Sequence, residues 1–193
     1  MLELEHKNRH ARDRCIRFQE EGHKYFVNEG LLLDPNCTSI DDSYTSVTTF
    51  IHSLFPVFDA DNVITKMMQS RKWESSKYYG MTRDAIKEQW AAAGRKASEA
   101  GTKLHADIEK FYNEEHVSNE SKEWGLFKQF AKDHESLHAY RTEWTLWDED
   151  VRICGSVDML FLNPDGTLRV YDWKRSKEIK KTNWFQKGTG KHV

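Results

Sequence analysis

Two aspartates in the last third of the sequence are spaced so that they could share a divalent cation. Residues 151–162 and 167–174 alternate apolar and polar side chains as strands do, and Pro-Asp-Gly at 164–166 is typical of a hairpin loop. Counting outward from this loop places Asp158 opposite Asp172. Opposed carboxylates about 5 Å apart repel by roughly 3 kcal/mol, and a divalent metal would relieve that repulsion. The alternatives are a register shifted by one residue, or two acids solvated at a sheet edge.

A lysine follows the second aspartate on the same face of the predicted hairpin. Lys174 lies two residues after Asp172 and opposite Ser156. A lysine beside a metal can position a nucleophilic water or stabilise charge on a phosphorane-like transition state. Trp173, between the two, points to the hydrophobic side, and its backbone carbonyl is available to a metal. Residues 172–174 therefore predict a site for chemistry on a charged substrate.

A predicted helix over residues 94–115 carries a histidine and a glutamate on one face. Its large apolar residues recur at the spacing of a single buried face, which supports the helix. His105 and Glu109 are four residues apart, so their side chains lie on the same side. Asp107 is expected to point away from His105 into solvent. His105 taken alone is more often a surface histidine than a ligand.

The elements that must position these residues change type along the chain. Helical periodicity dominates the middle of the sequence, and alternating strands follow it. This order predicts an α+β or α/β domain with a small mixed sheet. Strands are expected at 15–18, 24–27, 141–147, 151–162 and 167–174, a capped helix opening at 45–51, and helices at 59–75, 82–93, 94–115 and 122–138.

Length and charge restrict the classes of partner. The 193 residues suit one domain, expected at 15–193 after a charged segment at 1–14. The formal net charge is only −2, so nucleic acid would have to be held by local basic patches. The alternative for these patches is a solvated charged face. The candidate basic residues are Arg95, Lys96, Lys103, Lys177, Lys180 and Lys181.

The cysteines and the hydropathy pattern bear on cofactors and location. Cys15, Cys37 and Cys154 are far apart and form no CxxC pair, so neither a disulfide framework nor a structural zinc site is indicated. Three cysteines cannot supply the four ligands of an iron–sulfur cluster. The N-terminus lacks the apolar stretch of a signal peptide, and no apolar run approaches the roughly 20 residues that span a bilayer. An intracellular protein without a membrane partner is expected.

The motifs together resemble a known nuclease superfamily. Gly155-Ser156-Val157-Asp158, followed by Asp172-Trp173-Lys174, resembles the GxxD…DxK core of PD-(D/E)XK nucleases. The segment 101–109 resembles the GxxxHxxxE helix of the RecB-like branch, which includes viral and mitochondrial exonucleases. Each motif alone is weak, but their order and spacing match over about 45–181.

The resemblance implies a role for each motif residue. His105, Asp158 and Asp172 would hold the metal, and Lys174 would be the catalytic lysine. Glu109 matches the glutamate of the helix motif and would support the metal ligands, and Glu143 matches a further acidic position more loosely. The implied fold is a restriction-endonuclease-like core, and the implied cofactor is Mg²⁺ or Mn²⁺.

The implied activity is hydrolysis of DNA phosphodiester bonds at ends or in single strands. An exonuclease of DNA replication, recombination or repair is the leading hypothesis. The alternatives are a structure-specific endonuclease of the same superfamily, and a non-catalytic nucleic-acid-binding domain with a degenerate nuclease fold.

The chain departs from the family pattern in two respects. Many members of the branch carry an iron–sulfur cluster, which is not expected here. Members usually have a QxxxY helix after the DxK strand, whereas Gln186 is followed four residues later by Gly190. A shortened C-terminus is therefore expected, with the aromatic side chains of Tyr171 and Trp173 incompletely covered unless Trp184 and Phe185 fold back.

Overall fold

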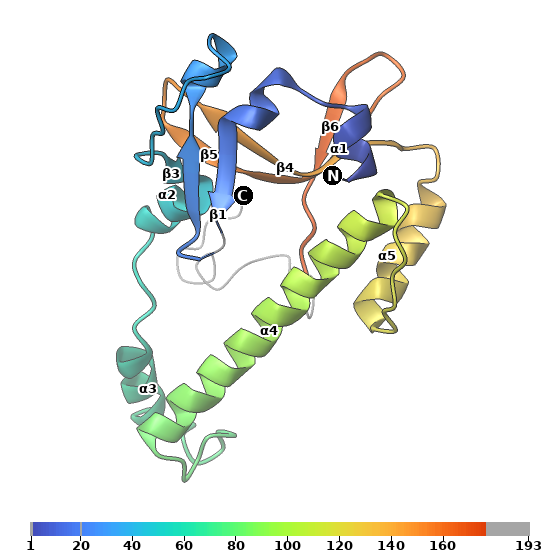
Figure 1. The fold of residues 1–193 in the computed structure, drawn as a ribbon. Coiled ribbons are helices and arrows are strands. Elements are labelled where there is room, and N and C mark those ends of the chain that lie inside the picture. The colour runs from blue at the N-terminus through green and yellow to red at the C-terminus, as the bar shows by residue number, and fades with distance from the viewer. Residues whose placement is uncertain (1, 20, 177–193) are drawn as a thin grey trace.

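A four-stranded mixed sheet organises the C-terminal part of the fold (Figure 1). The computed structural model describes residues 2–19 and 21–176. Its central strand, β5 (Ile153–Leu162), pairs antiparallel with β4 (His138–Asp148) and β6 (Leu168–Tyr171), and parallel with the short β3 (Thr45–Ser46). The expected meander is thus confirmed, and the fold is mixed α+β.

The hairpin between β5 and β6 has the predicted register, but it ends early. Leu162 pairs with Leu168 and Leu160 with Val170, as counting from the loop predicted. The last pair is Met159 with Tyr171, so the strand expected to reach residue 174 stops three residues sooner. The backbone N–H of Trp173 is donated to a side chain of β5 instead of to the strand ladder. Asp158 and Asp172, and likewise Ser156 and Lys174, are therefore not strand pairs.

One long helix replaces two predicted ones. Helix α4 (Arg83–Tyr112) has 30 residues and runs without a break through Gly94 and Gly101. The hydroxyl of Thr82 caps it by accepting a hydrogen bond from the N–H of Ala85. Its C-terminal part lies beside α5 (Lys122–Asp133), while its N-terminal part lies beside α3 (Ala60–Met68), far from the sheet (Figure 1). The helices expected at 59–75 and 122–138 are both shorter than predicted.

The N-terminal segment packs against β4. Helix α1 (Glu3–Lys7) and the 3-10 helix η1 (Ala11–Cys15) precede the hairpin of β1 (Ile16–Gln19) and β2 (Lys24–Val27), which lies where the sequence predicted. A second 3-10 helix, η2 (Glu29–Leu32), follows, and α2 (Val47–Ser53) begins after Ser46, whose hydroxyl accepts from Thr49 N–H as the expected cap. None of the helices in the described ranges is both long and apolar enough to cross a membrane.

Two aromatic-rich clusters form the core. One joins the N-terminal hairpin to the sheet around Val27, Tyr44 and Trp147. The other lies between α4 and α5 around Ile108 and Phe127, and Trp173 packs against it. Tyr171 and Trp173, expected to be incompletely covered, are both partly buried, because a ring of α5 contacts them: Phe130 lies 5.9 Å from Tyr171 and 5.3 Å from Trp173, centroid to centroid. Trp184 and Phe185 lie outside the described residues.

Breaking the buried ion pair between η1 and β4 should strongly destabilise the fold. Arg141 is nearly inaccessible, and its guanidinium donates to the carboxylate of Asp13 at 2.8 Å. Asp13→Ala should lower the free energy of unfolding by about 3 kcal/mol, because it leaves the buried guanidinium of Arg141 without its counter-ion. Denaturant titration measures this. Glu149→Ala is the control, since it breaks the more exposed pair with Arg12 and should cost less than about 1 kcal/mol. Equal losses in the two variants would contradict the prediction.

Candidate metal centre

The peptide groups of Trp173 position two of the candidate ligands at once. Its N–H donates to Asp158 Oδ2 at 2.7 Å, and its carbonyl accepts from His105 Nε2 at 2.8 Å. Its indole ring is fixed between Phe127 and Phe130 of α5. The carbonyl, predicted to be available to a metal, accepts a hydrogen bond from the histidine ring and so orients it. Helix α4 and strand β5 are joined here through a residue distant from both in sequence.

This hydrogen bond decides which nitrogen of His105 faces the acids. Since a carbonyl only accepts, Nε2 carries the proton, and Nδ1 of the neutral ring carries the lone pair. Nδ1 lies 3.4 Å from Glu143 Oε1 and 3.6 Å from Asp158 Oδ2. A lone pair facing two carboxylates is unfavourable unless a proton or a metal ion lies between them.

Glu143, which the sequence predicts only as a loosely matching acidic position, lies beside Asp158. In the β4–β5 ladder, Thr142 pairs with Met159 and Trp144 with Val157, so Glu143 lies opposite Asp158. Counting outward from the turn at 148–152 would have found this pair, just as counting found the register of the next hairpin. The backbone of Glu143 has φ +43°, in the left-handed region that non-glycine residues rarely adopt. Such a conformation costs about 1–3 kcal/mol and is typical of functional sites.

The three side chains have the composition of a metal site. Ligand atoms of His105, Glu143 and Asp158 all lie within 4.8 Å of one another, and each residue is half-buried. Burial raises the pKa of Asp158 despite the hydrogen bond from Trp173 N–H. The hydrogen bond to Glu143, and then the charge of Asp158 and the Trp173 carbonyl, raise the pKa of His105 against the effect of burial. The environment of these three side chains thus favours the binding of a proton or a metal cation.

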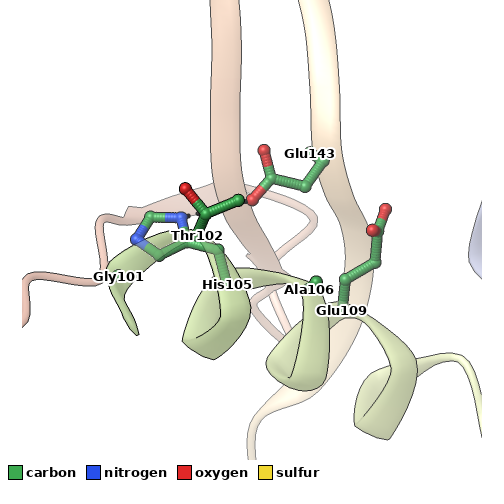
Figure 2. A pocket seen from close by; sticks show the side chains of 6 residues that line it. All are labelled: Gly101, Thr102, His105, Ala106, Glu109 and Glu143. Carbon is green, nitrogen blue, oxygen red and sulfur yellow. Dashed lines mark ion pairs between the residues drawn. The ribbon is translucent and has the colours of Figure 1, made fainter. Parts of the chain in front are cut away.

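Cavities open on both sides of this group. His105 and Glu143 line an open cavity of about 410 Å³ together with Glu109, one helical turn further along α4 (Figure 2). Burial, and then the charge of Glu143, raise the pKa of Glu109. Gly101 also lines this cavity, and a Cβ there would meet nothing within 4 Å, so a small side chain would fit at this position. Asp158 lines a second cavity of about 720 Å³, beside α2.

Asp172 and Lys174 lie at the second cavity, outside the group of three. Lys174 Nζ donates to Asp172 Oδ1 at 2.7 Å, and both side chains are more than half exposed. Because β6 ends at Tyr171, Asp172 no longer faces Asp158 across the sheet, although its charge contributes to raising the pKa of Asp158. Of the three predicted ligands, His105 and Asp158 thus lie together, while Asp172 lies outside the group that they form with Glu143.

The motif glycine of β5 has a packing role. A Cβ at Gly155 would lie 3.3 Å from Val47 Cγ2 of α2, which is tighter than ordinary van der Waals contact. Glycine therefore permits the close approach of α2 to β5, and this contact forms one side of the cavity that Asp158 lines.

The basic candidates have different environments. Arg95 and Lys96 are exposed on α4. Lys103 instead pairs with Asp107 at 2.8 Å, and Asp107 is buried and also accepts from Asn119 at 2.6 Å. The expectation that Asp107 is solvated is thus wrong, because the loop after α4 covers it. The other candidates, Lys177, Lys180 and Lys181, lie outside the described residues.

Comparisons with protein-family models, with curated proteins and with solved structures find no match to this chain.

The raised pKa of His105 predicts how its contribution to stability changes with pH. Without metal, the stabilising effect of protonated His105 is fully present below pH 6.5 and is lost as the pH rises through the higher pKa of the folded state. In EDTA, His105→Gln should therefore destabilise the protein more at pH 6 than at pH 8. Thermal melts at both pH values measure this. A loss independent of pH would contradict the electrostatic environment assigned to the ring.

The backbone of Glu143 gives a second prediction. In a strand, glycine is normally less stabilising than alanine. At φ +43° the order should reverse, with Glu143→Gly about 1 kcal/mol more stable than Glu143→Ala, because only glycine adopts this φ without strain. Urea titration of the two variants measures the difference. If the alanine variant is the more stable, Glu143 is not strained.

Proposed function

We propose that this chain is a divalent-metal-dependent nuclease of the PD-(D/E)XK type, which hydrolyses DNA phosphodiester bonds as an exonuclease in DNA replication, recombination or repair. One observation carries the proposal. A histidine from the GxxxHxxxE helix and an aspartate from the GxxD strand meet, and the backbone of the DxK segment holds both. Three motifs that resemble the family in sequence thus converge at one place, with an additional carboxylate from β4.

The chemistry of the donor set fits a small divalent cation. Two carboxylates supply the oxygen ligands that Mg²⁺ prefers, and one imidazole shifts the preference toward Mn²⁺. The Trp173 carbonyl keeps the proton of His105 on Nε2 and leaves Nδ1 free to bind, an arrangement typical of histidine ligands. His105, Glu143 and Asp158 would therefore hold the ion. When bound, it would lower the pKa of a water molecule and offset the charge of a phosphate.

The neighbouring side chains have roles in binding and positioning. Lys174, exposed at the mouth of the cavity that Asp158 lines, would hold a phosphate oxygen next to the metal centre. Asp172 would keep the ammonium group in place through their 2.7 Å contact. Glu109 would keep the cavity beside His105 acidic and so favour a cation there. Arg95 and Lys96 would contact DNA phosphates further along α4.

The fold is compatible with this proposal. The antiparallel strands β4, β5 and β6, with α4 beside them, would form the restriction-endonuclease-like core, since they carry the metal ligands. Cys15, Cys37 and Cys154 are all free thiols, as suits a protein in a reducing intracellular compartment.

Cleavage assays on end-labelled DNA test the proposal. Hydrolysis should require Mn²⁺ or Mg²⁺, with Mn²⁺ at least as effective, and should stop in EDTA. Glu143→Gln and Asp158→Asn should each lower kcat/KM by about 100-fold or more, because each removes a charged ligand. Lys174→Ala should lower cleavage about as strongly while leaving metal affinity unchanged. Activity of the wild type in EDTA would contradict the proposal.

Calorimetry with Mn²⁺ separates the ligands from their neighbours without any cleavage. Glu143→Gln should weaken binding more than Asp172→Asn does, because only Glu143 belongs to the group of three. Glu120→Gln is the control for loss of an exposed carboxylate and should bind as the wild type does. If Asp172→Asn abolishes binding and Glu143→Gln does not, the metal is held by the two aspartates.

A further inference from the structure

Helix α3 and the first turns of α4 form a small packed unit, here called the tip (residues 60–90), at the end of α4 remote from the sheet (Figure 1). Ile64 and Ile86 are completely buried at the contact between the two helices. Lys87 Nζ pairs with Asp61 at 2.5 Å across the same contact. The tip is therefore an ordered unit with its own apolar contacts.

A solvent-exposed stretch of α4 connects the tip to the candidate metal centre. Residues 91–99 of α4 are exposed on every side, so no described element packs on this stretch. A continuous helix rises 1.5 Å per residue, which places Arg83 about 33 Å from His105 along the axis. The tip is thus held at a fixed and large distance from the proposed site of cleavage.

The loop of the tip combines exposed aromatic and basic side chains. Successive backbone turns order it, with N–H to carbonyl bonds from Trp73 to Ser70 and from Tyr79 to Ser76. The ring of Tyr79 packs edge-on against Trp73 at 5.9 Å, yet the residue remains 57% exposed. The neighbouring Tyr78 accepts a hydrogen bond from Trp90 of α4, which attaches the loop to the helix. The ring of Tyr79 is thus exposed to solvent on an ordered loop that is attached to α4.

The charge of this loop is positive and not neutralised. Residues 69–83 contain four basic side chains and one acidic one. Arg71, Lys72 and Lys77 are exposed, and in the part of the chain that the structure describes no carboxylate lies within ion-pairing distance of them. Lys77 lies over the ring of Tyr78 instead, 4.8 Å from its centroid. The loop therefore offers stacking surface and positive charge together.

We propose that the tip binds single-stranded DNA. Tyr79 stacks on an unpaired base, while Arg71 and Lys72 contact the flanking phosphates. A single strand fits this surface better than a duplex, because bases in a duplex have both faces covered by their neighbours. The surface extends the proposed nuclease function, since it would hold the substrate away from the metal centre. The bond between Tyr78 and Trp90 places the loop beside Trp90, which lies about 22 Å from His105 along the helix axis, roughly 7 nucleotides at the spacing of stacked bases.

Fluorescence anisotropy with a labelled 30-nucleotide oligo-dT tests this without cleavage, because EDTA is present throughout. Tyr79→Ala should weaken binding about tenfold, while Tyr79→Phe keeps the stacking ring and should bind as the wild type does. Arg71→Ala with Lys72→Ala should weaken binding and reduce its salt dependence. Lys132→Ala, which removes an exposed charge on α5, is the control and should have little effect.

The outcomes separate this proposal from the nuclease proposal. Tyr79-dependent binding in EDTA supports the tip as a DNA surface even if no metal restores cleavage. Wild-type affinity in both Tyr79→Ala and the Arg71/Lys72 double variant would overturn it, as would equal affinity of the wild type for a duplex of the same length. Where cleavage occurs, Tyr79→Ala should raise KM for the 30-mer and leave kcat unchanged, because the residue lies far from the metal centre.

Discussion

The peptide groups of Trp173 hold the proposed metal centre together. One N–H and one carbonyl of the same residue bind Asp158 of β5 and His105 of α4, while the indole packs into the cluster between α4 and α5. The hydrogen bond to the Asp158 carboxylate contributes about 1.5–3 kcal/mol, but the larger effect of the two bonds is geometric. They fix the proton of His105 on Nε2 and so aim Nδ1 at two carboxylates. The packing of α5 thereby determines the orientation of ligands that α5 does not carry.

The same geometry makes the metal-free site unfavourable. Two half-buried carboxylates lie close to an imidazole lone pair, and one of them, Glu143, sits on a strained backbone. The raised pKa values of His105, Asp158 and Glu109 share one physical meaning, namely that the folded chain binds protons more tightly than the unfolded chain does. A divalent cation would satisfy the same demand for positive charge. The packing of the rest of the fold must supply the stability that this site lacks.

Local rules predicted much of this arrangement from the sequence. The loop at 164–166 gave the correct register for the β5–β6 hairpin, and helical spacing gave the buried face of α4 beside His105. Three features depend on tertiary contacts that no local pattern contains. The strand β6 ends early because Asp158 takes the N–H of Trp173, Asp107 is buried because Asn119 folds over it, and Glu143 joins the site through the β4–β5 register and a rare φ. The sequence therefore predicted that His105 and Asp158 lie together, but it placed Asp172 rather than Glu143 beside them.

Anomalous diffraction from crystals containing Mn²⁺ tests the central claim most directly, because it locates the ion without reference to any activity. The account predicts a peak about 2 Å from His105 Nδ1 and from one carboxylate oxygen each of Glu143 and Asp158, with Nε2 still bonded to the Trp173 carbonyl. A peak held by Asp158 and Asp172 with Glu143 outside its coordination would contradict the account, as would a peak at His105 Nε2 or no peak near these residues.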